Sequence, residues 1–277
     1  MPTLRTNGAE VAYSDTGAPS GKPDAPTIVF GHGLLFSGWM FKAQIEALRS
    51  SYRCVAIDWR GQGSSPPAED GRYDMDTLYE DALAVIDHLD VGPVHWVGLS
   101  MGGFVGQRLA ARNPDKLRSL TLLDTSPDRE EPFAAIQDKA LTVIYRLVGI
   151  GPVKPSVFKI MMCKPYRTNP ANKATIDEWI RQVNATDRKG MAGAILAVAN
   201  RKAIKAELGS VVAPTLVICG ADDVPTPVKK SEAIVAAIRG ARLEIVPESG
   251  HSSTIEQPVV ITGLIQNFVT EVDGRSA

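Results

Sequence analysis

The chain has 277 residues, of which 44% are hydrophobic and 22% charged, and its formal net charge is −1. This length suits one large domain, with room for an inserted subdomain and a substantial core. The near-neutral charge gives no reason to expect a nucleic acid or a membrane as partner. The first residues lack the pattern of a signal peptide and no apolar run could cross a bilayer, so we expect a cytoplasmic protein.

Short runs of Val, Ile and Leu recur along the chain, each followed by Gly or Asp. They occupy 27–30, 54–57, 94–99, 119–123, 215–219 and 243–246. Such runs are typical of parallel strands that are buried on both faces. Segments with helical periodicity, such as 75–89 and 258–272, follow strands. This alternation predicts an α/β fold, with a mostly parallel sheet and helices on both faces.

Three cysteines, Cys54, Cys163 and Cys219, lie far apart in the sequence and have no metal-ligand spacing. Two of them stand inside apolar runs, where a small buried thiol is the ordinary interpretation. We therefore expect no disulfide framework and no metal site, which agrees with a reducing compartment.

A Gly-Leu-Ser-Met-Gly segment at 98–102 ends the run at 94–99 and leads into a helical pattern. It matches G-x-S-x-G in the strand–turn–helix context that gives this motif its meaning. Small flanking residues allow a sharp turn that exposes Ser100 at the carboxyl edge of the sheet. Unpaired N–H groups at the start of the helix can stabilise an oxyanion there. The segment predicts a nucleophilic serine.

The alternation of strands and helices is interrupted once, at about 126–210, where only helical patterns separated by Pro and Gly occur. We expect a helical insertion at 127–209 in a core domain formed by 1–126 and 210–277. Within 151–210 the chain has eleven Lys and Arg against four Asp and Glu. The ordinary interpretation is a solvated helix surface, and a preference for anionic substrates is the alternative.

A serine hydroxyl needs a general base, and the chain has four histidines. His88 falls in a predicted helix and His95 begins a predicted strand, so we expect both to be structural. His251 stands in a loop after the last predicted strand, from which it can reach Ser100. The sequence therefore favours His251 as the base.

The base must itself be oriented by a carboxylate. Asp222 and Asp223 stand side by side after the strand at 215–219. Successive residues point in different directions, so only one of them is expected to face the site. Asp124, at the end of the strand at 119–123, is a rival acid.

Together these segments resemble the α/β-hydrolase superfamily, whose triad follows the order Ser, Asp, His along the chain. The motifs are HGLL at 32–35, DWRGQGSS at 58–65, GLSMGG at 98–103, and GADD at 220–223 with GH at 250–251. The chain is most similar to the branch that holds carboxylesterases, 3-oxoadipate enol-lactonases and cofactor-free haloperoxidases. The resemblance implies the α/β-hydrolase fold, with 127–209 as a helical cap subdomain over the pocket.

The resemblance also implies roles for single residues. It makes Ser100 the nucleophile, His251 the general base and Asp223 the acid. The backbone N–H groups of Leu34 and Met101 would form the oxyanion hole, and the histidine of HGLL would be structural. The candidates for substrate binding are Trp39 and Met40 behind the oxyanion turn, and Phe158, Met162, Tyr166 and Trp179 in the cap. Any single cap residue could equally pack the cap on itself.

We therefore expect a serine hydrolase that cleaves carboxylic esters or lactones of small molecules through an acyl-enzyme, with no metal or organic cofactor. An enol-lactonase is the sharper variant, and the basic cap favours it. A hydroxynitrile-lyase-type enzyme that cleaves C–C bonds could use the same triad, whereas a complete triad argues against a pure small-molecule receptor. Leu35 replaces the Pro common in haloperoxidase-type relatives, which argues against perhydrolysis. The sequence predicts nothing about oligomeric state.

Overall fold

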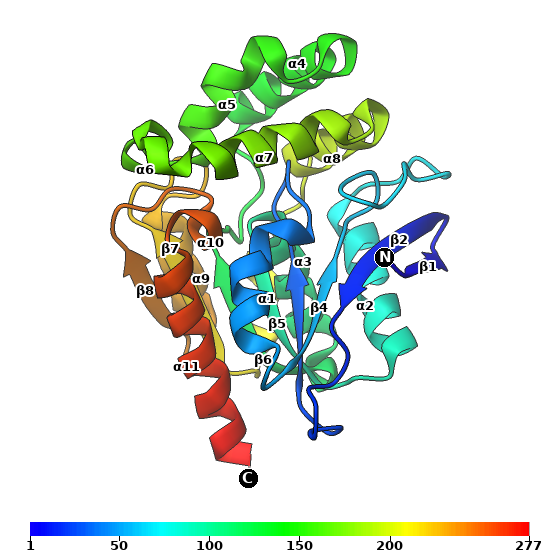
Figure 1. Cartoon of the computed structure of the whole chain (residues 1–277), viewed down its shortest axis with the longest axis vertical. Coiled ribbons are helices and arrows are strands. Elements are labelled where there is room, and N and C mark those ends of the chain that lie inside the picture. Colours follow the sequence, from blue (N-terminus) through cyan, green and yellow to red (C-terminus); the bar gives the residue numbers. More distant parts are fainter. Residues whose placement is uncertain (277) are drawn as a thin grey trace.

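A computed structural model describes residues 1–276. An eight-stranded sheet with the order β1-β2-β4-β3-β5-β6-β7-β8 forms its centre (Figure 1). The strands are β1 (Thr3–Thr6), β2 (Ala9–Asp15), β3 (Thr27–Gly31), β4 (Arg53–Ile57), β5 (Val94–Leu99), β6 (Leu117–Leu123), β7 (Thr215–Gly220) and β8 (Arg242–Val246). β2 pairs antiparallel with both β1 and β4, and the six strands from β4 to β8 in the sheet order pair parallel with one another. The six predicted strands are confirmed, and the two N-terminal strands are additional.

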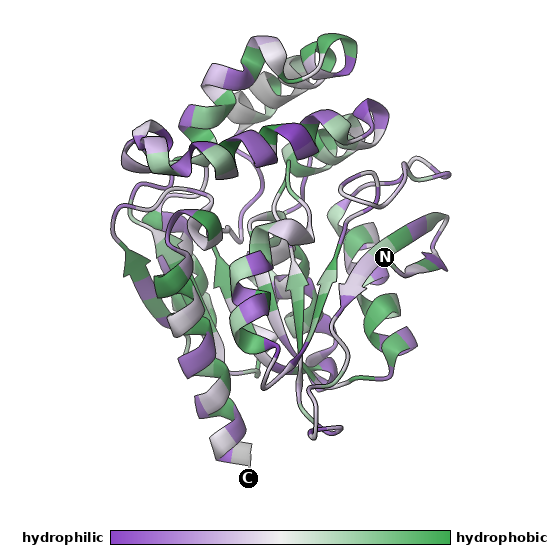
Figure 2. Cartoon of the chain, viewed as in Figure 1, coloured by the Kyte–Doolittle hydropathy of each residue, from purple (hydrophilic) through white to green (hydrophobic). Residues whose placement is uncertain are grey.

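Helices cover both faces of the sheet, which explains why every residue of β3, β5 and β7 is buried. Helices α2 (Met75–Leu89), α3 (Met101–Arg112) and α9 (Val228–Ala237) share one hydrophobic core with the sheet. Helices α1 (Lys42–Leu48) and α11 (Pro258–Ser276) share the other. Figure 2 shows the hydrophobic residues concentrated on the strands between these two layers. The short α10 (Ser253–Glu256) joins β8 to α11.

Between β6 and β7 the described chain forms helices and turns only. These are α4 (Pro132–Val148), α5 (Lys154–Met161), α6 (Lys164–Thr168), α7 (Lys173–Ala185) and α8 (Arg188–Ala199), and they gather above the carboxyl ends of the parallel strands (Figure 1). We call this group of helices the cap. Within residues 1–276, no helix combines the length and the apolarity that a membrane span requires.

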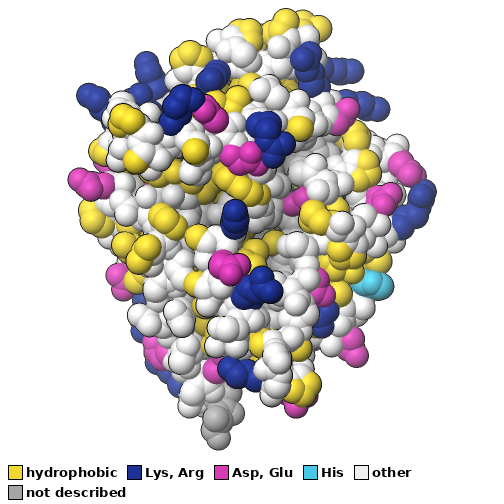
Figure 3. Space-filling view, viewed as in Figure 1, with side chains coloured by type: hydrophobic (Ala, Val, Ile, Leu, Met, Phe, Trp, Pro, Cys, Tyr) yellow, Lys and Arg dark blue, Asp and Glu magenta, His cyan; other side chains and the backbone are white. Residues whose placement is uncertain are grey.

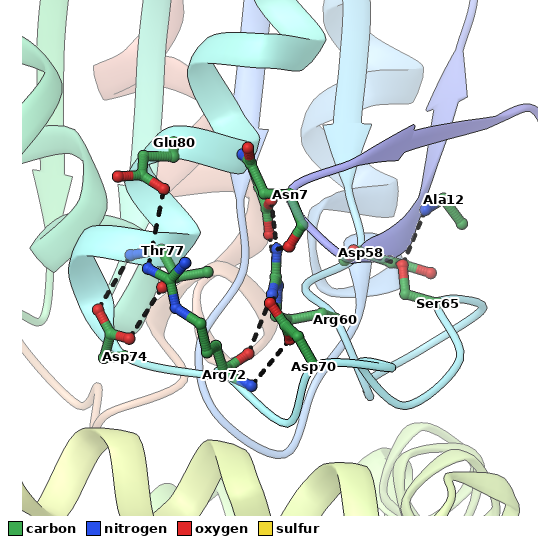
Figure 4. A network of polar contacts seen from close by, with 11 residues as sticks. Asn7, Ala12, Asp58, Arg60, Ser65, Asp70, Arg72, Asp74, Thr77 and Glu80 are labelled. Atoms are coloured by element: carbon green, nitrogen blue, oxygen red, sulfur yellow. Dashed lines mark hydrogen bonds and ion pairs between the residues drawn. The ribbon is translucent and has the colours of Figure 1, made fainter.

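A network of polar contacts anchors the loop after β4 (Figure 4). The Arg60 guanidinium is completely buried and pairs with Asp81 at 2.6 Å and with Asp70 at 3.4 Å. Ser65 accepts the Ala12 N–H at 2.8 Å, which ties the loop to β2. Since an unpaired buried charge is costly, Arg60 and Asp81 depend on each other. These contacts tie the loop that follows β4 to α2 and β2.

Candidate active site

Ser100 occupies a strained turn between β5 and α3, with φ +50° and ψ −106°. Residues other than glycine rarely adopt a positive φ. A Cβ on Gly98 would lie 2.2 Å from the Gly102 carbonyl oxygen, and a Cβ on Gly102 would lie 1.9 Å from that of Gly31. Both glycines are therefore required by backbone packing. They let the turn press against β3 while the serine projects from the edge of the sheet.

The structure brings Ser100, His251 and Asp223 together. His251 Nε2 lies 2.9 Å from Ser100 Oγ, and its Nδ1 lies 3.0 and 3.1 Å from the two carboxylate oxygens of Asp223. Thr226 donates its backbone N–H and its hydroxyl to the same carboxylate, at 3.1 and 2.7 Å. A carboxylate beside Nδ1 holds the proton on that nitrogen, which leaves Nε2 free to accept from the serine.

Interactions among His251, Asp223 and Thr226 shift the pKa values of the acid and of the histidine. Burial alone would raise the pKa of Asp223, but His251 and the hydrogen bonds from Thr226 lower it below its ordinary value. Burial alone would lower the pKa of His251, but the charge of Asp223 raises it above its ordinary value. The acid therefore stays ionised near neutral pH, and an imidazolium formed beside it is stabilised.

The rival acids occupy different environments. Asp222 is exposed, and its N–H donates to the Ser249 carbonyl at 2.9 Å. Asp124 is completely buried, and its Oδ1 accepts the Gly220 N–H at 2.8 Å. Burial raises the pKa of Asp124 to about 7, and the charge of Asp223 adds to this effect. Of the three, only Asp223 hydrogen-bonds His251 among the described residues.

One buried group of side chains has the composition of a metal site. Ligand atoms of Asp124, Cys219 and Asp223 lie within 4.8 Å of one another. Burial raises the pKa of Cys219 to about 12, which keeps the thiol protonated. Both Asp223 oxygens already accept hydrogen bonds. Because metal ligands must be deprotonated and free to coordinate, this donor set fits a cation poorly.

Leu34 and Met101 bring backbone N–H groups to the serine turn. Leu34 lies in the turn after β3, and Met101 is the first residue of α3. The Gly102 N–H donates to the His32 carbonyl at 3.1 Å, which joins the two segments. Within residues 1–276, neither the Leu34 nor the Met101 N–H has a hydrogen-bond acceptor. Two free N–H groups near Ser100 suit an oxyanion.

His32 shapes the turn that carries Leu34. Its imidazole is completely buried, accepts the Trp59 N–H at 3.0 Å and lies 2.7 Å from the Gly33 carbonyl oxygen. Met40 supports the same turn, since its Sδ accepts the Gly33 N–H at 3.3 Å. These contacts occupy the His32 ring and agree with a structural histidine.

A cavity with a volume of about 140 Å³ opens beside Ser100 and His251. Its walls are mostly apolar and include Leu34, Tyr145, Val153, Val157, Met161 and Ile195. Its two other charged residues, Arg201 and Glu130, form an ion pair with each other. An engineered cavity of ~150 Å³ binds benzene, so this one has room for an apolar group of similar size.

Comparison with known proteins agrees with this geometry. A family model described as alpha/beta hydrolase fold matches residues 26–153. The crystal structure of a hydrolase from Pseudomonas aeruginosa PA01 is 30% identical and has a TM-score of 0.86, with 97% of each chain covered. The chain belongs to the α/β-hydrolase superfamily. A thermophilic esterase from Thermogutta terrifontis is 28% identical, with a TM-score of 0.87 and coverage of 98% of this chain and 97% of that one. The 3-oxoadipate enol-lactonase 1 of Acinetobacter baylyi is 27% identical over 91% of this chain and 92% of its own.

In this α/β hydrolase, the six side chains expected to bind substrate are not among the residues that line the cavity. Trp179 is buried, stacks on Phe36 with ring centroids 5.5 Å apart, and donates to the Leu35 carbonyl at 2.9 Å. Phe158 packs edge-on against Trp179 at 5.2 Å. Met162 and Met40 are buried in the same core, and Trp39 and Tyr166 pack partly buried against it. These side chains pack where the cap meets the core, and their assignment to substrate binding stays a prediction.

The cavity wall comes instead from a neighbouring face of the cap. Val153, Val157 and Met161 recur every four residues at and along α5 and all line the cavity. Residues four apart lie on one face of a helix. This spacing was the signal in the sequence that could have separated them from Phe158. Arg201, which follows α8, had no such signal.

Proposed function

We propose that this α/β hydrolase is a serine hydrolase that cleaves carboxylic esters or lactones of small molecules. The observation that carries the proposal is the 2.9 Å contact between Ser100 Oγ and His251 Nε2 at an apolar cavity. The names of the esterase and enol-lactonase relatives support the same reaction class.

In the proposed mechanism, Ser100 Oγ attacks the carbonyl carbon while His251 Nε2 takes its proton. The N–H groups of Leu34 and Met101 stabilise the oxyanion. His251 then gives its proton to the leaving alkoxide, and the acyl-enzyme forms. A water molecule, deprotonated by His251, attacks the acyl-enzyme and releases the carboxylic acid, which restores Ser100. Asp223 orients the imidazole and stabilises its charged form throughout.

The charges around the cavity favour neutral substrates. Arg201 is the only cationic side chain besides His251 among the described residues that line the cavity, and Glu130 neutralises it. Lys154, Lys159 and Lys164 do not line it, so the basic cap gives an anionic substrate no partner there. A neutral ester with a small apolar group fits this lining better than a lactone that carries a free carboxylate.

Covalent labelling tests the proposal. Wild-type protein should react with a fluorophosphonate probe and turn over p-nitrophenyl acetate. Ser100→Ala should fold normally, resist the probe and lose turnover by ~10⁴-fold, because members of a triad act as a unit. Turnover retained by Ser100→Ala would exclude Ser100 as the nucleophile.

A further inference from the structure

Exposed aliphatic side chains gather on the outer helices of the cap. We call this group the cap ridge, and it consists of Ile136, Val143, Ile144, Leu147 and Val148 of α4 with Ile160 of α5. Val143 and Leu147 are 59% and 71% exposed and lie four residues apart, hence on one helix face. An apolar helix face of this kind is usually buried against the rest of the protein. Large exposed apolar side chains that recur on one helix indicate an interaction site.

All of the cap ridge except Ile136 lies in a segment that is strongly basic. Between residues 142 and 176 the chain has six Lys and Arg and no Asp or Glu. Arg146 and Lys159 are exposed next to ridge residues, and the Arg188 guanidinium donates to the Leu147 carbonyl at 3.1 Å. None of these three forms an ion pair with another described side chain. Figure 3 shows hydrophobic side chains at the top of the molecule with Lys and Arg on either side.

We propose that the cap ridge docks this protein on an anionic lipid surface. Aliphatic residues on one helix face, flanked by basic residues, are the combination that lies in a membrane interface. Each nearby Lys or Arg adds attraction to anionic headgroups. A second copy of the chain fits this surface poorly, because a two-fold contact would bring the same basic groups together. The ridge also lies on the outermost helices of the molecule (Figure 1), where a lipid surface can reach it.

One residue of the cap ridge also belongs to the candidate active site. Ile160 is 42% exposed and also lines the cavity beside Ser100. Docking would therefore place an edge of the cavity near the lipid, and an apolar substrate dissolved there could enter with little exposure to water. This last step rests on the proposed function, whereas docking itself does not.

Vesicle sedimentation tests the docking. Wild-type protein should sediment with vesicles of phosphatidylcholine and phosphatidylglycerol at low salt, bind phosphatidylcholine alone much more weakly, and dissociate as salt is raised. The double variant Val143→Ser/Leu147→Ser should lose affinity by at least about tenfold, because two aliphatic side chains no longer enter the lipid. Val212→Ser/Val259→Ser is the matched control, since both residues are as exposed but lie outside the cap. It should bind like wild type.

Turnover and oligomeric state complete the test. Val143 and Leu147 do not line the cavity, so the ridge variant should hydrolyse a water-soluble ester like wild type. Ser100→Ala should bind vesicles normally, which separates docking from the proposed function. Absence of vesicle binding, equal binding to both vesicle types, or equal losses in the two double variants would overturn the proposal. So would a wild-type dimer in analytical ultracentrifugation that the ridge variant abolishes without any lipid binding.

Discussion

Two buried carboxyl groups lie behind His251, and their surroundings give them opposite properties. Asp223 accepts hydrogen bonds from His251 and Thr226, which hold its pKa below the ordinary value. Asp124 sits deeper, and burial raises its pKa to about 7. When the surroundings of two neighbouring carboxyl groups push their pKa values apart, the two groups take different roles. Only the ionised one can orient the histidine.

Replacement of each aspartate by asparagine should distinguish the role of Asp223 from that of Asp124. Asp223→Asn should lower kcat by ~10²-fold or more, because the amide can favour the wrong tautomer of His251. Asp124→Asn should stay within ~10-fold of wild type, since it replaces a group that is mostly neutral below pH 7. Steady-state kinetics on folded variants, checked by circular dichroism, measures both. A larger loss in Asp124→Asn would assign the acid to the end of β6.

The pH dependence of activity tests how Asp223 affects the pKa of His251. The proposed mechanism needs neutral His251, whose pKa is raised above 6.5 in the folded protein. The acid limb of kcat/KM should therefore have its midpoint above pH 6.5, with activity rising as the pH rises. In Asp223→Asn the residual activity should show a lower midpoint, because the carboxylate that raises the pKa is gone. An unchanged midpoint would mean that another group controls the limb.

At the scale of elements, the cap is fastened to the loop that carries His251. The Glu256 carboxylate of α10 accepts the N–H of Cys163 at 2.8 Å and that of Ser252 at 3.0 Å. The Ser252 hydroxyl donates to the Met161 carbonyl at 2.7 Å. Ser252, the residue that follows the histidine, is thus bonded to Met161 directly and is linked to Cys163 through Glu256. We therefore expect the position of His251 to depend on the cap.

Glu256→Gln tests this dependence. Its amide nitrogen would face one of the two N–H groups, so the loop should shift and kcat should fall by about tenfold, with a smaller change in KM. The acid limb of kcat/KM should also move to lower pH, because the charge of Glu256 helps to raise the pKa of His251. Glu248→Gln, an exposed change in the same loop, is the control. If Glu256→Gln changed thermal stability but neither kcat nor the pH profile, Glu256 would have a structural role only.

The elements that the sequence predicted are those with strong local patterns. Continuous apolar runs marked the six parallel strands, and the G-x-S-x-G context marked the serine turn. β1 was missed because it has only four residues, none of them fully buried. The cavity lining was missed for another reason. Whether Val157 or Phe158 faces the cavity depends on how the cap docks, and both residues are apolar and adjacent.

At the scale of the whole molecule, the net charge of −1 conceals an uneven distribution of basic and acidic residues along the chain. The basic segment of the cap faces outward, while the one guanidinium among the described cavity residues is paired. Composition alone therefore gave no hint of a lipid partner. The local excess of Lys and Arg at 151–210 left an anionic substrate as the alternative to a solvated surface, because a count does not tell which side chains line the cavity.

The selectivity between neutral and anionic esters tests which of these charges act on the substrate. Lys154→Gln/Lys159→Gln/Lys164→Gln should change kcat/KM equally for a neutral ester and for a carboxylate-bearing ester of the same length. Glu130→Gln should instead favour the carboxylate-bearing ester by about tenfold, because Arg201 then lacks its partner and can bind the anion. Kinetics with the two matched esters measures the ratio. A ratio that shifts in the triple variant would assign these lysines a role in substrate binding.

The junction of cap and loop also contains a chemical reporter. Cys163 is buried there, its Sγ donates to the Glu248 carbonyl at 3.4 Å, and burial raises its pKa to about 12. Alkylating reagents attack the exposed thiolate, so this thiol becomes reactive only when the cap leaves the loop. Cys54 and Cys219 lie within β4 and β7 and become reactive when the sheet opens. The order in which the three thiols are alkylated would therefore distinguish detachment of the cap from unfolding of the core.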